Sequence, residues 1–108
     1  MTVQKAIELA RALRPCEIGD EILTHFLAEL ETELALCIRG ESGCAPCKVV
    51  SRGELSVPAP FDRVYWLYLV SLIDFSTGNS GAFATSDALF REARDAYAKW
   101  VQRTGGNA

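Results

Sequence analysis

The stretch from residue 57 to residue 75 constrains the fold of this chain more than any other. It reads VPAPFDRVYWLYLVSLIDF and is apolar in almost every direction around a helix. A helix that is hydrophobic nearly all round has to be buried on most sides. Its two prolines fit a first helical turn, where the missing N–H costs nothing, and Gly78 and Asn79 tolerate the left-handed backbone that ends a helix. The sequence therefore predicts a central helix around which the rest of the chain packs.

The same stretch is too short to cross a membrane. A spanning helix needs about 20 mostly apolar residues, whereas Asp62, Arg63 and Asp74 bracket a shorter uncharged run. The first residues also lack the pattern of a secretory signal, because Lys5 and Glu8 interrupt the apolar run. We therefore expect no membrane association and a protein that begins in the cytoplasm, where cysteines stay reduced.

Two amphipathic helices are expected before the central one. Thr2 can cap the first, and Pro15 ends it. Asp20 and Glu21 place negative charge in the first turn of the second, which Gly40 stops. The predicted apolar stripe of this second helix consists of Ile22, Leu23, Phe26, Leu27, Leu30, Leu34 and Cys37, and its solvent side is marked by Glu29, Glu31 and Glu33.

A fourth helix is expected after a connection of small residues at 78–84. Thr85 or Ser86 can cap it. Its predicted buried stripe consists of Leu89, Phe90, Ala93, Tyr97, Trp100 and Val101. Residues 105–108 have the composition of a flexible tail.

Between the second helix and the central one, residues 48–57 have weak strand character around Arg52-Gly53. They fit either a small hairpin or an extended arm. The predicted fold class is therefore all-α: one compact four-helix domain over residues 1–104, with an irregular loop or short hairpin between helices two and three.

The four cysteines provide the strongest chemical motif, Cys44-Ala45-Pro46-Cys47. It looks like a thioredoxin-type redox pair, but that chemistry needs a helix that follows a strand, and a helix precedes the motif here. Zinc is the second interpretation, with Cys37 or Cys16 and His25 completing four ligands. A second paired half-site is missing, so a loop with free thiols is the simplest interpretation.

Other catalytic patterns are absent from the sequence. There is one histidine and neither a Gly-x-Ser-x-Gly nor a Glu-x-x-His motif. The glycines near residue 80 precede no Gly-Lys-Ser/Thr, so they form no phosphate loop. We expect no enzyme activity, no cofactor and no metal.

Charge is unevenly distributed along the chain. The net charge of −3 argues against nucleic acid as the main partner. The second helix is rich in acidic residues, whereas the last carries Arg91, Arg94, Lys99 and Arg103. Surfaces of opposite sign suit head-to-tail contacts that can close into rings. The alternative is that each surface is simply a solvated helix face.

Several stretches resemble small prophage-encoded head–tail connector (adaptor) proteins of tailed phages of Gram-positive bacteria. The most specific is the opening of the central helix, Val57-Pro58-Ala59-Pro60, followed by an aromatic residue, Asp62 and Arg63. The similarity covers nearly the whole chain, and its other parts are TVQKAI at 2–7, LRP at 13–15, FLAELE at 26–31, LVSLID at 69–74 and ALFREA at 88–93.

The resemblance implies a structural protein that docks under the portal ring of the capsid. Copies would form a ring around the DNA channel and bridge to the next tail component, first in the host cytoplasm and then at the head–tail junction of the virion. The segment at 41–57 and the termini would meet neighbouring proteins. The Cys44-to-Cys47 motif is a departure from the family pattern.

Two alternatives remain open at this stage. One is a small helical binding or regulatory module from a mobile element, which a single basic face would favour; its candidate residues are Arg11, Arg14, Arg91, Arg94 and Arg103. The other, less favoured, is a zinc or thiol-redox protein that uses Cys44 and Cys47.

Overall fold

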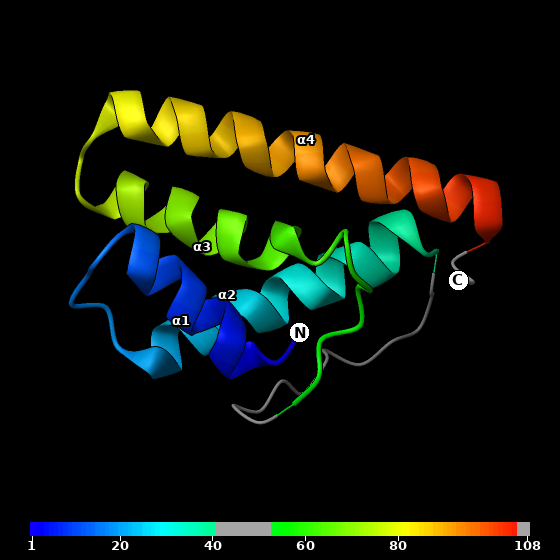
Figure 1. Cartoon of the computed structure of the whole chain (residues 1–108), viewed down its shortest axis with the longest axis horizontal. Coiled ribbons are helices and arrows are strands. Elements are labelled where there is room, and N and C mark those ends of the chain that lie inside the picture. The colour runs from blue at the N-terminus through cyan, green and yellow to red at the C-terminus, as the bar shows by residue number, and fades with distance from the viewer. Residues whose placement is uncertain (41–52, 106–108) are drawn as a thin grey trace.

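The structure is a computed structural model that describes residues 1–40 and 53–105. Within these residues the chain forms four α-helices and no strand, and a π-helical segment continues the second helix (Figure 1). The elements are α1 (Val3–Leu13), α2 (Asp20–Glu33), η1 (Leu34–Ile38), α3 (Arg63–Ser76) and α4 (Ser80–Thr104). The predicted all-α, four-helix class is confirmed.

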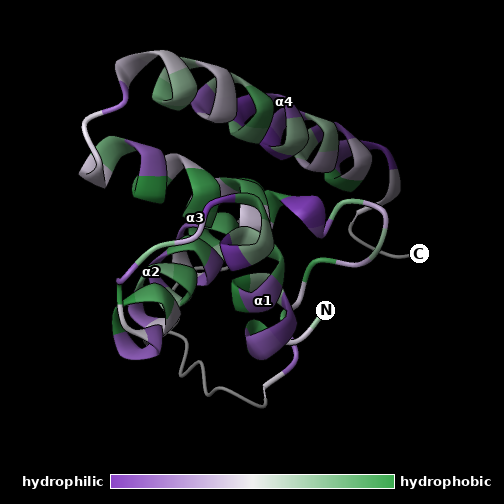
Figure 2. Ribbon diagram, turned by 60° about the vertical axis from the view of Figure 1, so that its left-hand side comes forward, coloured by the Kyte–Doolittle hydropathy of each residue, from purple (hydrophilic) through white to green (hydrophobic). Residues whose placement is uncertain are grey.

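Helices α3 and α4 form a long antiparallel hairpin, and α1 and α2 lie on the other side of α3 (Figure 1). Helix α3 packs against each of the other three α-helices. Hydrophobic residues predominate along α3, whereas α1, α2 and α4 carry both hydrophobic and hydrophilic residues (Figure 2). None of the helices in the described part of the chain is long and apolar enough to span a bilayer.

The predicted helix ends at Thr2 and Gly78 are confirmed. The N–H of Lys5 donates to the Thr2 hydroxyl at 3.1 Å, which caps α1. Gly78 has a φ of 75°, where a residue with a Cβ would be strained, and it follows Thr77, the C-cap of α3.

The start of α3 differs from the prediction. The helix begins at Arg63, whereas Pro58 and Pro60 lie in a turn in which the Phe61 N–H donates to the Pro58 carbonyl at 2.9 Å. A residue that precedes proline is disfavoured in the helical region. Val57 and Ala59, which each precede a proline, therefore lie outside the helix, and the Ala59–Pro60 peptide bond is cis.

The start of α4 also differs, because the prediction of a cap at Thr85 or Ser86 is wrong. Asn79 caps the helix by accepting the Ala82 N–H at 3.1 Å, and α4 begins at Ser80. Ser86 is buried inside the helix. A short, uncharged run of small residues is compatible with a helix when packing against α3 supports it.

Two predicted helix faces are wrong at particular residues. Ile22, Cys37 and Leu89 are exposed instead of buried, and Glu31 is buried instead of exposed. The π-helical turn explains Cys37: the Arg39 N–H donates to the Leu34 carbonyl at 3.0 Å, five residues back. This wider turn rotates the residues that follow it relative to the stripe of α2.

Residues 53–57 form an arm beside the first residues of the chain. The Leu55 N–H donates to the Met1 carbonyl at 2.9 Å, and the Val3 N–H donates to the Gly53 carbonyl at 3.1 Å. An isolated bridge between Thr2 and Glu54 joins the two segments. The remainder of the loop, residues 41–52, lies outside the described residues.

Candidate functional site

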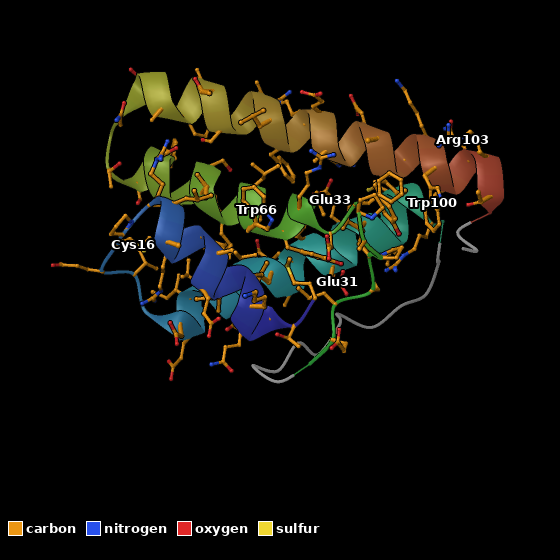
Figure 3. All side chains as sticks on the ribbon, in the orientation of Figure 1. Cys16, Glu31, Glu33, Trp66, Trp100 and Arg103 are labelled. Carbon is orange, nitrogen blue, oxygen red and sulfur yellow. The ribbon has the colours of Figure 1, made fainter. Side chains whose placement is uncertain are left out.

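A buried polar network surrounds Glu31, which lies on α2 and is only 6% exposed (Figure 3). Its carboxylate accepts a hydrogen bond from the Tyr65 hydroxyl on α3. It also accepts the N–H of Ser56 at 3.1 Å and the hydroxyl of Ser56 at 3.0 Å. The Val57 N–H in turn donates to the Tyr65 hydroxyl at 2.9 Å. The network therefore holds the residues just before α3 against α2.

Tyr65 stays protonated in this network over the whole neutral range. Burial raises its pKa, and the hydrogen bond to Glu31 and the charge of that carboxylate raise it further. A neutral hydroxyl can donate to the carboxylate while it accepts from Val57. Because three donors of the chain already occupy the carboxylate, this arrangement positions backbone and is unsuited to general-base chemistry.

Asp74 forms a second buried polar group, which joins three helices. It is 2% exposed, and its two carboxylate oxygens accept from Nε of Arg14, which directly follows α1, and from the Ser86 hydroxyl on α4, each at 2.8 Å. From the sequence, Asp74 was only the charge that ended an apolar run. A carboxylate in a buried helix needs partners, and that rule could have indicated this cluster.

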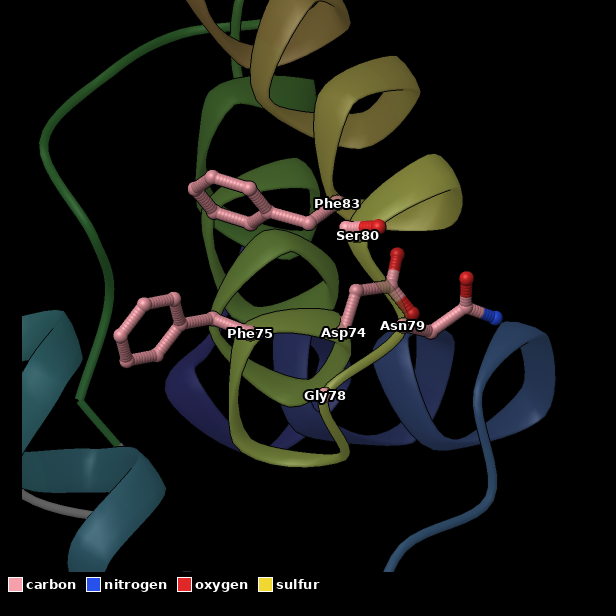
Figure 4. Close-up of a pocket in the computed structure, with 6 residues that line it drawn as sticks. All are labelled: Asp74, Phe75, Gly78, Asn79, Ser80 and Phe83. Atoms are coloured by element: carbon pink, nitrogen blue, oxygen red, sulfur yellow. The ribbon is translucent and has the colours of Figure 1, made fainter.

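The link between α3 and α4 carries an open apolar cavity of about 270 Å³. Phe75 and Phe83 form one wall, with ring centroids 5.6 Å apart in an edge-on arrangement. Their rings point to the same side of the hairpin, away from Asn79 (Figure 4). We call residues 75–83 the tip. Phe75 is 69% exposed, although it ends the stretch from which we expected a helix buried on most sides.

Phe75 and Phe83 are the last of three aromatic pairs that repeat every seven residues along the α3–α4 hairpin. Residues seven apart return to the same face of a helix, and the pairs follow this spacing on both sides. The pairs and their centroid distances are Phe61–Tyr97 at 6.3 Å, Tyr68–Phe90 at 5.0 Å and Phe75–Phe83 at 5.6 Å. Tyr97 is buried, whereas at the tip Phe75 is exposed and Phe83 is half-buried.

A second, smaller cavity of about 120 Å³ lies between α3 and α4, away from the tip. Leu67, Leu89 and Ala93 provide its apolar surface, and Arg63 and Glu92 contribute one charge of each sign. Leu89 is 47% exposed. We call this cavity the Leu89 groove.

The predicted zinc ligands are not gathered in the described part of the chain. His25 is exposed and pairs with Glu29 at 2.8 Å. Cys37 follows His25 by twelve residues (37 − 25) along α2 and η1, which at 1.5 Å per residue separates them by roughly 18 Å. Zinc ligands lie within about 2.3 Å of one metal, so these two residues cannot share an ion.

Cys44 and Cys47 lie outside the described residues. In residues 1–40 and 53–105 no group of three His, Cys, Asp or Glu side chains could hold a metal ion. Cys16, in the link between α1 and α2, is half-buried, and Cys37 is exposed.

The five arginines of the regulatory hypothesis do not form one basic face. They lie on α1 and α4, on opposite sides of α3 (Figure 1). Four of them pair with carboxylates of the same chain, in the pairs Arg11–Asp20, Arg14–Asp74, Arg91–Asp87 and Arg94–Glu33. The last pair joins the basic helix to the acidic one, so part of the predicted charge contrast is neutralised inside the protomer.

Comparisons with models of known protein families, with curated proteins and with solved structures find no match to this chain.

Proposed function

We propose that this chain is a structural phage assembly protein, a head–tail connector that docks to the portal and forms a ring. In this proposal α3 is the central helix of the domain, and the segment between α2 and α3 meets neighbouring proteins. The partners are the portal protein and a tail-side connector, with no membrane and no sequence-specific nucleic acid. The proposal starts from the resemblance carried by residues 57–65.

The observation that supports it best is how the end of this segment is held. Residues 53–57 are bonded on one side to residues 1–3 and on the other to Glu31. The resemblance assigns neighbour contacts to this segment and to the termini, and these hydrogen bonds bring the segment and the N-terminus together. A contact surface fixed by the protein's own fold loses less entropy when a partner binds.

The residues that carry the resemblance also have a packing role. Val57 is 1% exposed, and its N–H bonds to the hydroxyl of Tyr65, which is fully buried. This packing of Val57 and Tyr65 supports the interpretation that the Val-Pro-Ala-Pro sequence before α3 serves the fold, and in this proposal related connectors share it.

Quantitative mass spectrometry of phage particles induced from the source strain tests the proposal. We expect roughly a dozen copies per particle, in proportion to a cyclic portal ring. Intact particles that lack the protein would overturn it, and the helical regulatory module would then lead. The zinc or thiol alternative is tested by Cys44→Ser combined with Cys47→Ser: unchanged stability and assembly, without bound metal, would exclude it.

A further inference from the structure

The π-helical turn η1 aligns two side chains that an α-helix would separate. Arg39 follows Glu31 by eight residues (39 − 31), and a continuous α-helix would set their directions roughly 80° apart. Both nevertheless bond to Ser56, whose hydroxyl donates to the Glu31 carboxylate and accepts from the Arg39 guanidinium. We call these two contacts the latch. The wider turn of η1, closed between the Arg39 N–H and the Leu34 carbonyl, makes the latch possible.

The same turn carries Cys37 out of the apolar stripe of α2. Cys37 follows Leu30 by seven residues (37 − 30), so an uninterrupted α-helix would place the two within roughly 20° of each other around the axis. Leu30 is 1% exposed, whereas Cys37 is exposed. The hydrophobic pattern therefore favours one register of this segment, with Cys37 in the stripe, and the structure adopts another.

Ile38 is compatible with both registers. It lies four residues after the fully buried Leu34 and packs against the core, and residues four apart share a face of an α-helix. In the α register the Arg39 N–H would bond to the Ala35 carbonyl instead of the Leu34 carbonyl, so no backbone hydrogen bond is lost. Conversion of η1 would keep the contact of Ile38, withdraw Arg39 from Ser56 and turn Cys37 inward.

We propose that η1 is a conformational switch with two registers, a π register that closes the latch and an α register that opens it. The hydrogen bond between Arg39 and Ser56 forms in the π register alone and therefore favours it. A contact that takes Ser56 away from Arg39 reorients the end of α2. In the proposed connector a neighbour at residues 53–57 would supply that contact, and in this respect the switch rests on the proposed function.

The rate at which iodoacetamide modifies Cys37 tests the switch in the isolated chain. Ser56→Ala removes the acceptor of Arg39 without changing the charge of the chain. We expect Cys37 to react at least about threefold more slowly in this variant, because a hydrogen bond to a charged group shifts an equilibrium by roughly tenfold or more. Simple loosening of the helix end would speed the reaction instead. Cleavage after glutamate places Cys37 in a peptide without another cysteine, so mass spectrometry follows it in the otherwise unmodified chain.

Ser76→Ala is the matched control. Ser76 is also exposed, and its hydroxyl donates to the Ile73 carbonyl at 2.8 Å, within α3. This variant should leave the rate at Cys37 unchanged. A second measurement reads the register directly: the NMR coupling across the hydrogen bond of the Arg39 N–H should connect it to Leu34 in the unmodified chain and to Ala35 in Ser56→Ala.

Two results would overturn the switch: a rate at Cys37 that is unchanged or faster in Ser56→Ala, or an Arg39 coupling that stays with Leu34 in that variant. Both are independent of the particle measurement. A chain present at portal stoichiometry whose η1 keeps a single register retains the connector and loses the switch. A chain that changes register but is absent from particles does the reverse.

Discussion

The hydroxyl of Tyr65 donates a hydrogen bond to the carboxylate of Glu31, which lies 34 residues earlier in the chain. Both groups are buried. Together with Ser56 and Val57, this pair fixes the path of the chain into α3. The stretch with the most specific resemblance is therefore held by a polar contact between α2 and α3.

Replacing Glu31 with Ala is expected to lower the free energy of unfolding by about 2–4 kcal/mol. The Tyr65 hydroxyl and the Ser56 N–H would lose their acceptor, and an unsatisfied buried donor costs about 1–3 kcal/mol. Urea denaturation measures the change. Glu29→Ala, at an exposed position of the same helix, is the control and should change stability by less than about 1 kcal/mol. Equal losses in the two variants would contradict the role of the network.

We expect the protein to lose stability in alkali because the pKa of Tyr65 is raised by folding. Its pKa is raised in the folded protein, so above the ordinary value of about 10 the unfolded chain releases a proton that the folded chain keeps. The stabilising contribution is complete below pH 10 and declines as pH rises, by up to about 1.4 kcal/mol per pH unit.

The test is urea denaturation of the unmodified protein and of Tyr65→Phe at several pH values between pH 8 and pH 11.5, with the denaturation midpoints compared. The variant should be less stable at pH 8 by about 1–3 kcal/mol, because Val57 and Glu31 lose a partner, and its stability should fall less steeply above pH 10. Tyr68→Phe is the control for a tyrosine without the Glu31 bond, since its pKa is also raised, mainly by burial. Parallel curves for Tyr65→Phe and the unmodified protein would refute the prediction.

Leu69→Ala is expected to cost about 2–5 kcal/mol. The sequence predicts the same cost at Leu72, but Leu69 is fully buried and Leu72 is only half-buried. Thermal unfolding of the two variants should therefore show the larger loss at Leu69. If neither variant loses stability, α3 is not the core of the domain.

Asp74→Ala should destabilise the protein by about 2–4 kcal/mol, because a hydrogen bond to a charged group contributes about 1.5–3 kcal/mol. Both Arg14 and Ser86 would lose their acceptor. Ser86→Ala removes one of the two bonds and should cost less. The readout is urea denaturation, and a Ser86→Ala loss as large as that of Asp74→Ala would mean that Arg14 contributes nothing.

Local patterns were sufficient for some of the fold. Thr2 and Gly78 mark helix ends because capping and a positive φ depend on a few neighbouring residues. Local patterns were insufficient to predict the structure of residues 57–62 and 80–86. There the prolines lie outside α3, because a residue before proline avoids the helical region. Small residues lie inside α4, because packing against α3 outweighs weak local propensity.

The sequence by itself determined the all-α class, the helix count and most of the buried stripes, because hydrophobic periodicity is a property of each segment alone. Only the tertiary structure decided that Glu31 is buried, that Asp74 joins three helices and that Phe75 is left open at the tip. Glu31 and Asp74 depend on which residues of other helices lie opposite, and these partners are 12 to 60 positions away in the sequence. The periodicity of one helix carries no information about that pairing.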